Sequence, residues 1–185
     1  MIKRVLWIVA VSLFAASVTW AAVTAKFTLN MSLQQTKTLD LNTVRDTVSL
    51  NRGPSLTDGT GDNQADVMWH DKRTLADGAT ETLDIQDGTL TNAVGTAVTI
   101  DILKVLYIKN KSSDANLEIG GAPTTDIRLF KVTGDILTLP PGGEFLFSAP
   151  LASGVDTTTN SDLKMTHDGT GTSSLDYEII VVGVD

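Results

Sequence analysis

Short apolar runs alternate with polar, glycine-rich stretches along most of the chain. Within several runs apolar and polar residues alternate one by one, as at 80–85, where Leu83 and Ile85 fall on one side. A period of two is that of a β-strand with one buried face, and many short strands between turn residues are typical of a sandwich or barrel. The pattern predicts strands at 27–33, 37–41, 47–50, 80–85, 98–100, 103–110, 116–119, 127–132, 136–139, 144–148, 163–166 and 175–182.

Two of these runs, 103–108 and 177–182, are almost continuously apolar, which predicts central strands covered on both faces. Asp-Gly steps beginning at 58, 77, 87 and 168 favour tight turns, and the Pro-Pro-Gly-Gly at 140–143 predicts a rigid corner. Residues 62–72 hold at most one helical turn. We therefore expect an all-β fold, a single antiparallel β-sandwich of the jelly-roll type, over residues 51–185.

Residues 26–50 have a simpler composition and alternate well enough to form strands. They predict an extended N-terminal arm that lies across the domain or across a neighbouring subunit. Such an arm can add a strand to the edge of a neighbour's sheet.

The first 25 residues have the three parts of a secretory signal peptide. Lys3 and Arg4 are followed by an uncharged, apolar stretch, and small residues close it, ending in the A-x-A-like triplet at 23–25. Cleavage there would start the mature protein near Lys26 and place it in the periplasm, on the cell surface or outside the cell. The alternative is a retained anchor, because residues 5–25 are just long enough to span a bilayer.

Composition narrows the possible functions. The formal net charge is −8, and it becomes −10 without the leader, which holds two basic residues and no acid. An acidic domain repels phosphate backbones, which argues against nucleic-acid binding. The chain has no cysteine, so no disulfide stabilises it. The 160 residues after the leader are enough for one domain with a proper core.

Catalysis finds little support in the sequence. His70 and His167 are the two histidines, and the G-x-S-x-G turn of many serine hydrolases does not occur. His70 is followed by Asp71, but neighbours in a strand point to opposite faces. We therefore expect a protein that is not an enzyme.

One loop gathers ligands that calcium prefers. Asp58, Asp62 and Asp66 lie close together between glycines, although the spacing is not that of an EF-hand and the terminal bidentate Glu is missing. An Asx-rich turn is the simpler interpretation, and calcium is the one cofactor the sequence suggests.

Trp69 is the sole tryptophan outside the leader. An exposed Trp69 would anchor an interface or stack on a sugar. The other aromatic residues fall within strand patterns and are expected in the core: Tyr107, Phe130, Phe145, Phe147 and Tyr177.

An ordered series of short motifs resembles bacteriophage virion proteins of the small jelly-roll decoration (capsid cement) type. The motifs cover about two thirds of the chain. They are DGTGDNQAD at 58–66, WHDKRTLA at 69–76, ETLD at 81–84, NAVGTAVT at 92–99, KVLYIKN at 104–110, GGA at 120–122, PGG at 141–143, FLF at 145–147, AP at 149–150 and YEII at 177–180 before Gly183. The resemblance implies an eight-stranded jelly roll that self-associates and clamps capsid subunits from outside.

The leader departs from that family, because capsid parts assemble in the cytoplasm and need no export signal. We expect a structural or assembly protein that forms homo-oligomers, as a virion decoration protein or an exported self-assembling relative, with a capsid or a cell-surface lattice as its partner. The alternative is a secreted binding module for a cell-surface glycan or polymer. A membrane association is expected only if residues 5–25 remain as an anchor.

Overall fold

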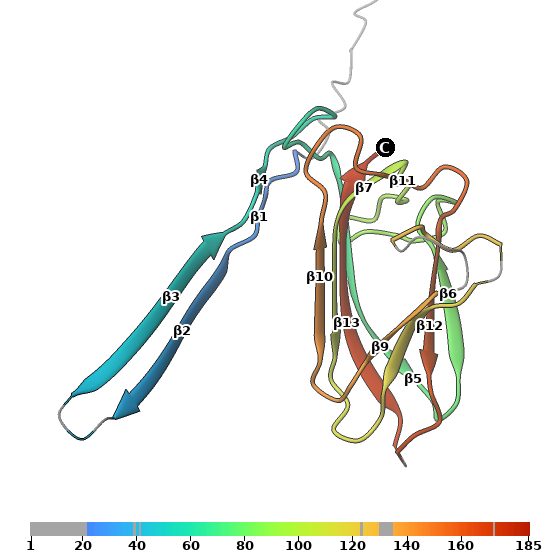
Figure 1. Ribbon diagram of the computed structural model, residues 1–185. Helices are drawn as coiled ribbons and strands as arrows, with labels where there is room; N and C mark the ends of the chain where they lie inside the picture. The colour runs from blue at the N-terminus through green and yellow to red at the C-terminus, as the bar shows by residue number, and fades with distance from the viewer. Residues whose placement is uncertain (1–21, 39, 41, 123, 130–134, 172) are drawn as a thin grey trace, which may run out of the picture.

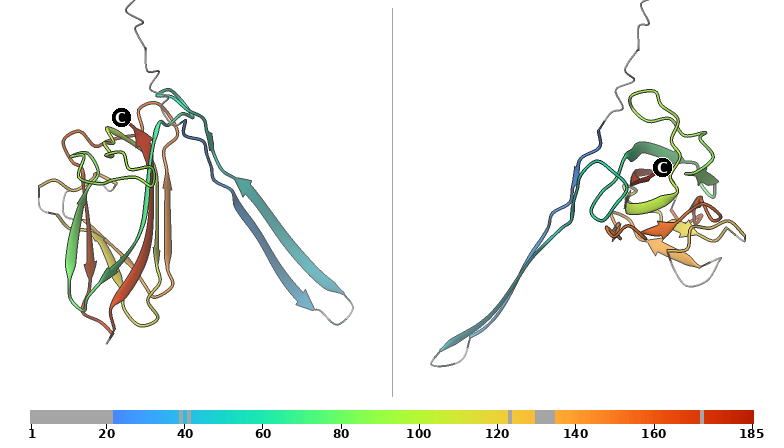
Figure 2. Two further views of the ribbon diagram at one scale, coloured as in Figure 1. Left: turned by 180° about the vertical axis from the view of Figure 1, so that it is seen from behind. Right: turned by 90° about the horizontal axis from the view of Figure 1, so that it is seen from above.

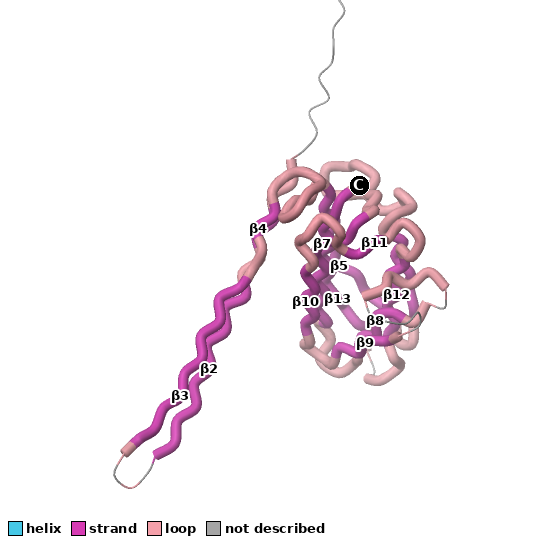
Figure 3. Tube along the Cα trace, turned by 45° about the horizontal axis from the view of Figure 1, so that its top comes forward, coloured by secondary structure: helices cyan, strands magenta, loops and turns pink. Residues whose placement is uncertain are grey.

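The described part of the chain is built from β-strands. The computed structural model describes residues 22–185 apart from 39, 41, 123, 130–134 and 172. Over this part of the chain the structure contains strands and loops but no helix (Figure 3). No helix of the described residues is therefore long and apolar enough to cross a membrane. The predicted leader falls outside the described residues except for its last four positions.

Two antiparallel sheets pack face to face to form a sandwich (Figure 1). The first sheet has the order β10-β7-β13-β5, and the short β11 also pairs with β7. Its strands are β5 (Val67–Leu75), β7 (Ile102–Asn110), β10 (Glu144–Ser148), β11 (Val155–Asp156) and β13 (Leu175–Val184). The second sheet has the order β6-β12-β8-β9, with β6 (Thr80–Asp84), β8 (Leu117–Gly120), β9 (Ile136–Leu139) and β12 (Asp162–His167).

The order of the strands is that of a jelly roll. The chain crosses repeatedly between the sheets, so the first sheet holds β5, β7, β10 and β13 and the second holds β6, β8, β9 and β12. Eight strands in two such sheets are the double Greek key of jelly rolls. The prediction of an all-β sandwich with an N-terminal arm is confirmed.

The core lies between the two sheets and is apolar. Alternate residues of each strand point inward, as on β12, where Leu163, Met165 and the end residue His167 are buried. The strand at 177–182 is central, as predicted, because β13 lies between β7 and β5. Its outer face is not fully covered as expected, since the outward Ile180 is half-buried. Phe145 and Phe147 of β10 pack against the core and are partly buried.

The structure corrects several predictions of the sequence pattern. Residues 62–72 contain no helical turn. Most of this stretch belongs to the start of β5, an edge strand whose polar side chains are exposed to solvent. Val98, Ile100 and Ile127 are buried without belonging to a strand, because a sandwich also buries the loops that close its ends. Tyr107 faces outward from the sheet. Phe130 and the end of the predicted strand at 127–132 are outside the described residues.

A long hairpin extends away from the sandwich (Figures 1 and 2). It consists of β2 (Leu29–Thr38) and β3 (Thr43–Arg52), and it leaves the body through the short pair β1 (Ala25–Lys26) and β4 (Ser55–Leu56). The predicted arm therefore exists as one hairpin of two ten-residue strands rather than three short strands.

Candidate functional site

The hairpin, which we call the arm, has one apolar face and one polar face. In an antiparallel pair directly opposed residues share a face, and the register pairs Met31 with Leu50 and Leu33 with Val48. The opposite face carries Ser, Thr, Asn, Gln and Arg side chains, as in the pairs Ser32–Ser49 and Gln34–Thr47. The arm's apolar face comprises Leu29, Met31, Leu33, Val44, Val48 and Leu50.

This apolar face is open to solvent. Leu33 is 56% exposed and Val48 is 54% exposed. A two-stranded hairpin alone is marginally stable in water, and contiguous exposed apolar surface marks an interaction site. The arm is therefore the strongest candidate for a functional surface in the described residues.

The arm is the outer part of one continuous ribbon. Ala25 pairs with Leu56 and Leu29 pairs with Arg52, so the register of β1–β4 continues without a shift into β2–β3. The ladder is interrupted between them at Pro54, whose ring lacks an N–H. The Pro54 carbonyl still accepts a hydrogen bond from the Phe27 amide at 3.2 Å.

The inner part of the ribbon packs on the outer face of the first sheet. Ala25 and Leu56 form a buried cluster with Val105 and Val182, and Phe27 lies partly buried against it. These three ribbon residues lie on the same side of the ribbon as Leu29 and Met31, because they follow the same alternation. The arm's apolar face is thus the outward continuation of a face that already binds this sheet.

The aspartate-rich loop fastens the ribbon to the body instead of gathering into a metal site. Asp58 accepts a hydrogen bond from the Val23 amide at 3.0 Å, Asp62 from the Ala152 amide at 2.6 Å, and Asp66 from the Asp185 amide at 3.0 Å. Among the described residues no group of three or more His, Cys, Asp or Glu side chains could hold a metal ion. Calcium at this loop stays a prediction.

Buried Lys104 joins the same fastening. Its Nζ donates a hydrogen bond to the Leu151 carbonyl, in the loop that also receives the Asp62 contact. Burial lowers the pKa of the Lys104 ammonium, and the nearby Asp62 carboxylate partly opposes this effect. The loops at this end of the sandwich hold the root of the arm through charge and backbone contacts together.

The outer face of the first sheet carries an apolar patch just below the root of the arm. Leu146, Tyr107 and Ile180 are paired side by side across β10, β7 and β13, and Met68 lies one row higher on β5. Leu146 is 45% exposed and Met68 is 40% exposed, while Tyr107 and Ile180 are half-buried. We call Met68, Tyr107, Leu146 and Ile180 the outer apolar patch.

Below the outer apolar patch the same face becomes charged. Lys109 forms an ion pair with Glu144 at 2.6 Å, and Lys111 forms one with Glu178 at 2.7 Å. The hydrogen bond from Lys109 lowers the pKa of Glu144, and the hydrogen bond from Lys111 lowers that of Glu178. The face therefore runs from apolar to charged along its strands.

The outer face of the second sheet is different. The register places Thr82 beside Lys164, and Thr166 between Thr80 and Glu118. Ile136, on the edge strand β9, is the exposed large apolar residue of the second sheet. The contrast with the first sheet singles out the first sheet's outer face as the apolar one.

Trp69 is not an interface residue. Its side chain is 3% exposed and belongs to the core between the sheets. The alternation along β5 points Trp69 inward and its neighbours Met68 and His70 outward. The prediction of an interface role for Trp69 is thereby corrected, and Met68 is the β5 residue that the surface offers.

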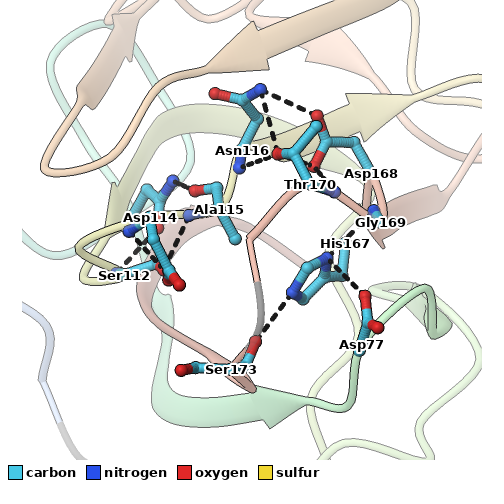
Figure 4. A network of polar contacts seen from close by, with 11 residues as sticks. Asp77, Ser112, Asp114, Ala115, Asn116, His167, Asp168, Gly169, Thr170 and Ser173 are labelled. Carbon is cyan, nitrogen blue, oxygen red and sulfur yellow. Dashed lines mark hydrogen bonds and ion pairs between the residues drawn. The ribbon is translucent and has the colours of Figure 1, made fainter.

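The two histidines do not form a catalytic pair. His70 is exposed on the outer face of β5, whereas the His167 ring is buried at the end of β12. The Gly169 amide donates to His167 Nδ1 at 3.1 Å, so the ring proton lies on Nε2, which is 3.0 Å from the Ser173 carbonyl (Figure 4). Asp77 lies farther away, at 3.8 Å from Nδ1. The ring therefore holds the loop after β12 through these two hydrogen bonds.

Polar contacts also organise the neighbouring loops (Figure 4). Asp168 accepts hydrogen bonds from Asn116 at 2.7 Å and from the Thr170 amide at 2.9 Å. Partial burial raises the pKa of Asp168, but the hydrogen bonds from Thr170 and Asn116 outweigh it and bring the pKa to about 2. A pocket of about 190 Å³ lies beside this network, lined by Lys111, Ser112, Ser113, Asp114, Ser173, Ser174 and Asp176.

This pocket is smaller than the usual ligand site of roughly 300–1,000 Å³. Its lining is made of serines, aspartates and one lysine, without an apolar wall for a ligand. It offers a small polar surface, and the arm and the outer apolar patch remain the better candidates.

The sequence contained a signal for one of these surfaces and not for the other. The one-by-one alternation at 29–33 marks the arm's apolar face directly. Tyr107 and Ile180 lie within almost continuous apolar runs, so alternation does not tell their outward side from their inward side. Met68 and Leu146 were missed because each stands alone among polar or core residues.

Comparisons of the chain with models of protein families, with curated proteins and with solved structures found no match.

Proposed function

We propose that this protein is a non-catalytic building block that self-assembles through its arm, as a virion decoration protein or an exported relative with the same way of assembling. The single observation that carries the proposal is the arm itself. It presents an unpaired apolar face on a ribbon that projects from an otherwise well-packed sandwich. Such a face needs a partner to be covered.

The fold is compatible with this role. Double-sheet jelly rolls occur in viral capsid proteins as well as in lectins. This is an analogy of fold, and a fold alone does not assign a function. The analogy agrees with the motif series at 58–180 that resembles the phage decoration proteins.

The sugar-binding alternative loses its main support. It depended on an exposed Trp69, and that side chain lies in the core. We therefore put forward self-assembly into a homo-oligomer as the function, with a capsid or a cell-surface lattice as a further partner.

Export belongs to the same proposal and has its own test. We expect mass spectrometry of the native protein to find an N-terminus near residue 26. Ala25 and Val23 both pack in the cluster at the root of the arm, and the Val23 amide donates to Asp58, so cleavage immediately after Ala25 would remove these contacts and leave Leu56 and Phe27 in the cluster. An intact Met1 would contradict export and favour assembly in the cytoplasm or a retained anchor.

The assembly proposal is tested by removing the arm. In the variant, residues 29–52 are replaced by Asn-Gly, which favours a tight hairpin turn, so that β1 and β4 stay paired. We expect light scattering at micromolar concentration to find oligomers for the full chain and a monomer for the variant. Thermal unfolding of the variant should be close to that of the full chain, because the core is untouched. A full chain that stays monomeric would contradict the proposal.

A further inference from the structure

We infer that the arm of one copy docks with its apolar face on the outer face of the first sheet of a second copy, over the outer apolar patch of Met68, Tyr107, Leu146 and Ile180. This inference rests on the proposed function and names both halves of the contact. The occupant of the patch is a second copy of this chain.

The first argument is continuity with a contact that already exists. The root of the ribbon packs Leu56 and Phe27 on Val105 and Val182 of the first sheet, and the arm's apolar face continues that side of the ribbon. The outer apolar patch, in turn, continues the same sheet surface beyond Val105 and Val182. Both surfaces therefore continue the apolar contact that the root already makes within one copy.

The second argument is the order of residue types along each surface. From its root the arm's apolar face runs through Leu29, Met31 and Leu33 and then reaches Gln35 and Lys37. The sheet runs from the apolar row containing Ile180 to the charged row containing Glu178 and Lys109. On β3 the same face carries Arg52 opposite Leu29, then Leu50 and Val48, and then Asp46 opposite Gln35. Apart from Arg52 at the root, each surface therefore has an apolar part near the root and a charged part farther out, so the two can be matched in one orientation.

The third argument is charge complementarity. The arm, residues 29–52, contains three basic and two acidic residues, a net charge of +1, whereas residues 53–185 contain eight basic and twenty acidic residues, a net charge of −12. An arm is therefore attracted to the body of another copy and repelled by another arm. This favours docking of arm on body over pairing of two arms through their apolar faces.

The dimensions agree with the inference. The arm strands and β13 each have ten residues, which at about 3.3 Å per residue is about 30 Å. An arm can therefore lie along most of the length of a neighbour's sheet. In its own copy the arm points away from the sandwich, which leaves the patch open to a second chain (Figures 1 and 2).

The absence of cysteine makes the contact directly testable. One variant carries Val48→Cys on the arm's apolar face and another carries Leu146→Cys in the patch. Stacked sheets lie about 10 Å apart, too far for a disulfide, so a short bis-maleimide is the cross-linker. We expect a mixture of the two variants to give a cross-linked dimer whose joined peptides contain positions 48 and 146. Because each chain has one cysteine, this product can form only between copies.

The matched control moves the cysteine to the polar face of the arm. Thr47→Cys is next in sequence to Val48 but points to the other side, and it should not cross-link to Leu146→Cys. Two results would overturn the inference: dimers formed by Val48→Cys alone, which mean arm-on-arm pairing, or equal cross-linking from positions 47 and 48. A double variant with both cysteines on one chain that cross-links only within that chain would also overturn it.

A second measurement does not depend on cross-linking. Leu146→Lys should weaken self-association about tenfold or more, because a charge would be buried in the contact. Thr138→Lys, on the second sheet's outer face, should leave self-association within about twofold. Equal effects of the two substitutions would rule out the first sheet as the docking surface.

The outcomes separate this inference from the proposed function. A full chain that never associates contradicts both. A full chain that associates, loses association without its arm and yet gives no link between positions 48 and 146 contradicts the docking surface alone.

Discussion

At the scale of single residues, buried polar groups are paired and connect strands that are far apart in sequence. In the described residues no buried side-chain nitrogen or oxygen lacks a hydrogen-bond partner. The clearest case joins the two sheets: the Tyr177 hydroxyl donates to Glu81 at 2.8 Å, and Arg73 donates to the other oxygen of Glu81 at 2.7 Å. Burial and the Glu81 carboxylate both raise the pKa of Tyr177, so its hydroxyl stays a donor at neutral pH.

Removing this hydroxyl should destabilise the sandwich. Tyr177→Phe leaves the half-buried Glu81 with one partner fewer, and we expect a loss of about 1–2 kcal/mol in the free energy of unfolding. Urea denaturation measures it. The control is Tyr107→Phe, whose hydroxyl hydrogen-bonds the exposed Glu144 on the outer face, so its removal should change stability by less than about 0.5 kcal/mol. Equal losses would contradict a specific role for the contact between Tyr177 and Glu81.

Asp168 should make stability depend on pH in the acid range. Its pKa is lowered from 3.8 to about 2, so the folded state favours the carboxylate. This stabilisation is present above pH 3.8 and is lost as the pH falls toward 2. Asp168→Asn should therefore flatten the curve of stability against pH in that window. Unfolding measured at several acid pH values checks it, and an unchanged slope would show that Asp168 is not responsible.

At the scale of elements, the two strands of the ribbon approach each other closely at Gly53, between the body and the arm. A Cβ added at Gly53 would lie 1.8 Å from the Phe27 carbonyl oxygen, so no side chain fits there without moving the backbone. Gly53 and Pro54 together interrupt the ladder while the register continues. We expect this close contact between Gly53 and Phe27 to set the direction in which the arm leaves the sandwich.

Gly53→Ala should loosen or redirect the arm without unfolding the body. The clash with Phe27 must push the two strands apart, so amide hydrogen exchange at Phe27 and along the root of the arm should become faster. Self-association should weaken, while the thermal unfolding of the sandwich stays nearly unchanged. Ser55→Ala, two residues away on an exposed strand position, is the control and should have little effect. Exchange unchanged at Phe27 would contradict the proposed role of Gly53.

At the scale of the whole molecule, charge is distributed unevenly: the arm is basic and the body is acidic. The arm, residues 29–52, has a net charge of +1, and residues 53–185 have a net charge of −12. The arm of one copy is therefore attracted to the body of another, while two bodies repel each other. In the assembly that we propose, repulsion keeps the bodies apart and the arms provide the attraction.

Salt should therefore slow assembly. Screening at high ionic strength shortens the range of attraction, which lowers the association rate more than it raises the dissociation rate. Stopped-flow light scattering at increasing NaCl concentration measures both rates. A variant with Arg45→Gln and Arg52→Gln should associate more slowly at low salt and respond less to added salt. An association rate that does not change with salt would contradict electrostatic steering.

The sequence alone determined the class of fold. Period-two alternation, Asp-Gly turns and the apolar run at 177–182 are local properties, and they suffice to predict strands, turns and a central strand. The same alternation at 29–33 was enough to predict an arm. These features follow from backbone geometry, which acts over a few residues and can be recognised within each segment.

Which side of each strand is exposed to a partner depends on how the strands pack together in three dimensions. Trp69 and Met68 are adjacent, and the packing of the sheets buries the first and exposes the second. The aspartates of the 58–66 loop form a fastening because three distant amides lie beside them. The outer apolar patch is assembled from β5, β7, β10 and β13, whose order in the sheet depends on the path of the whole chain. Burial is a property of the packed molecule, and local pattern cannot determine it.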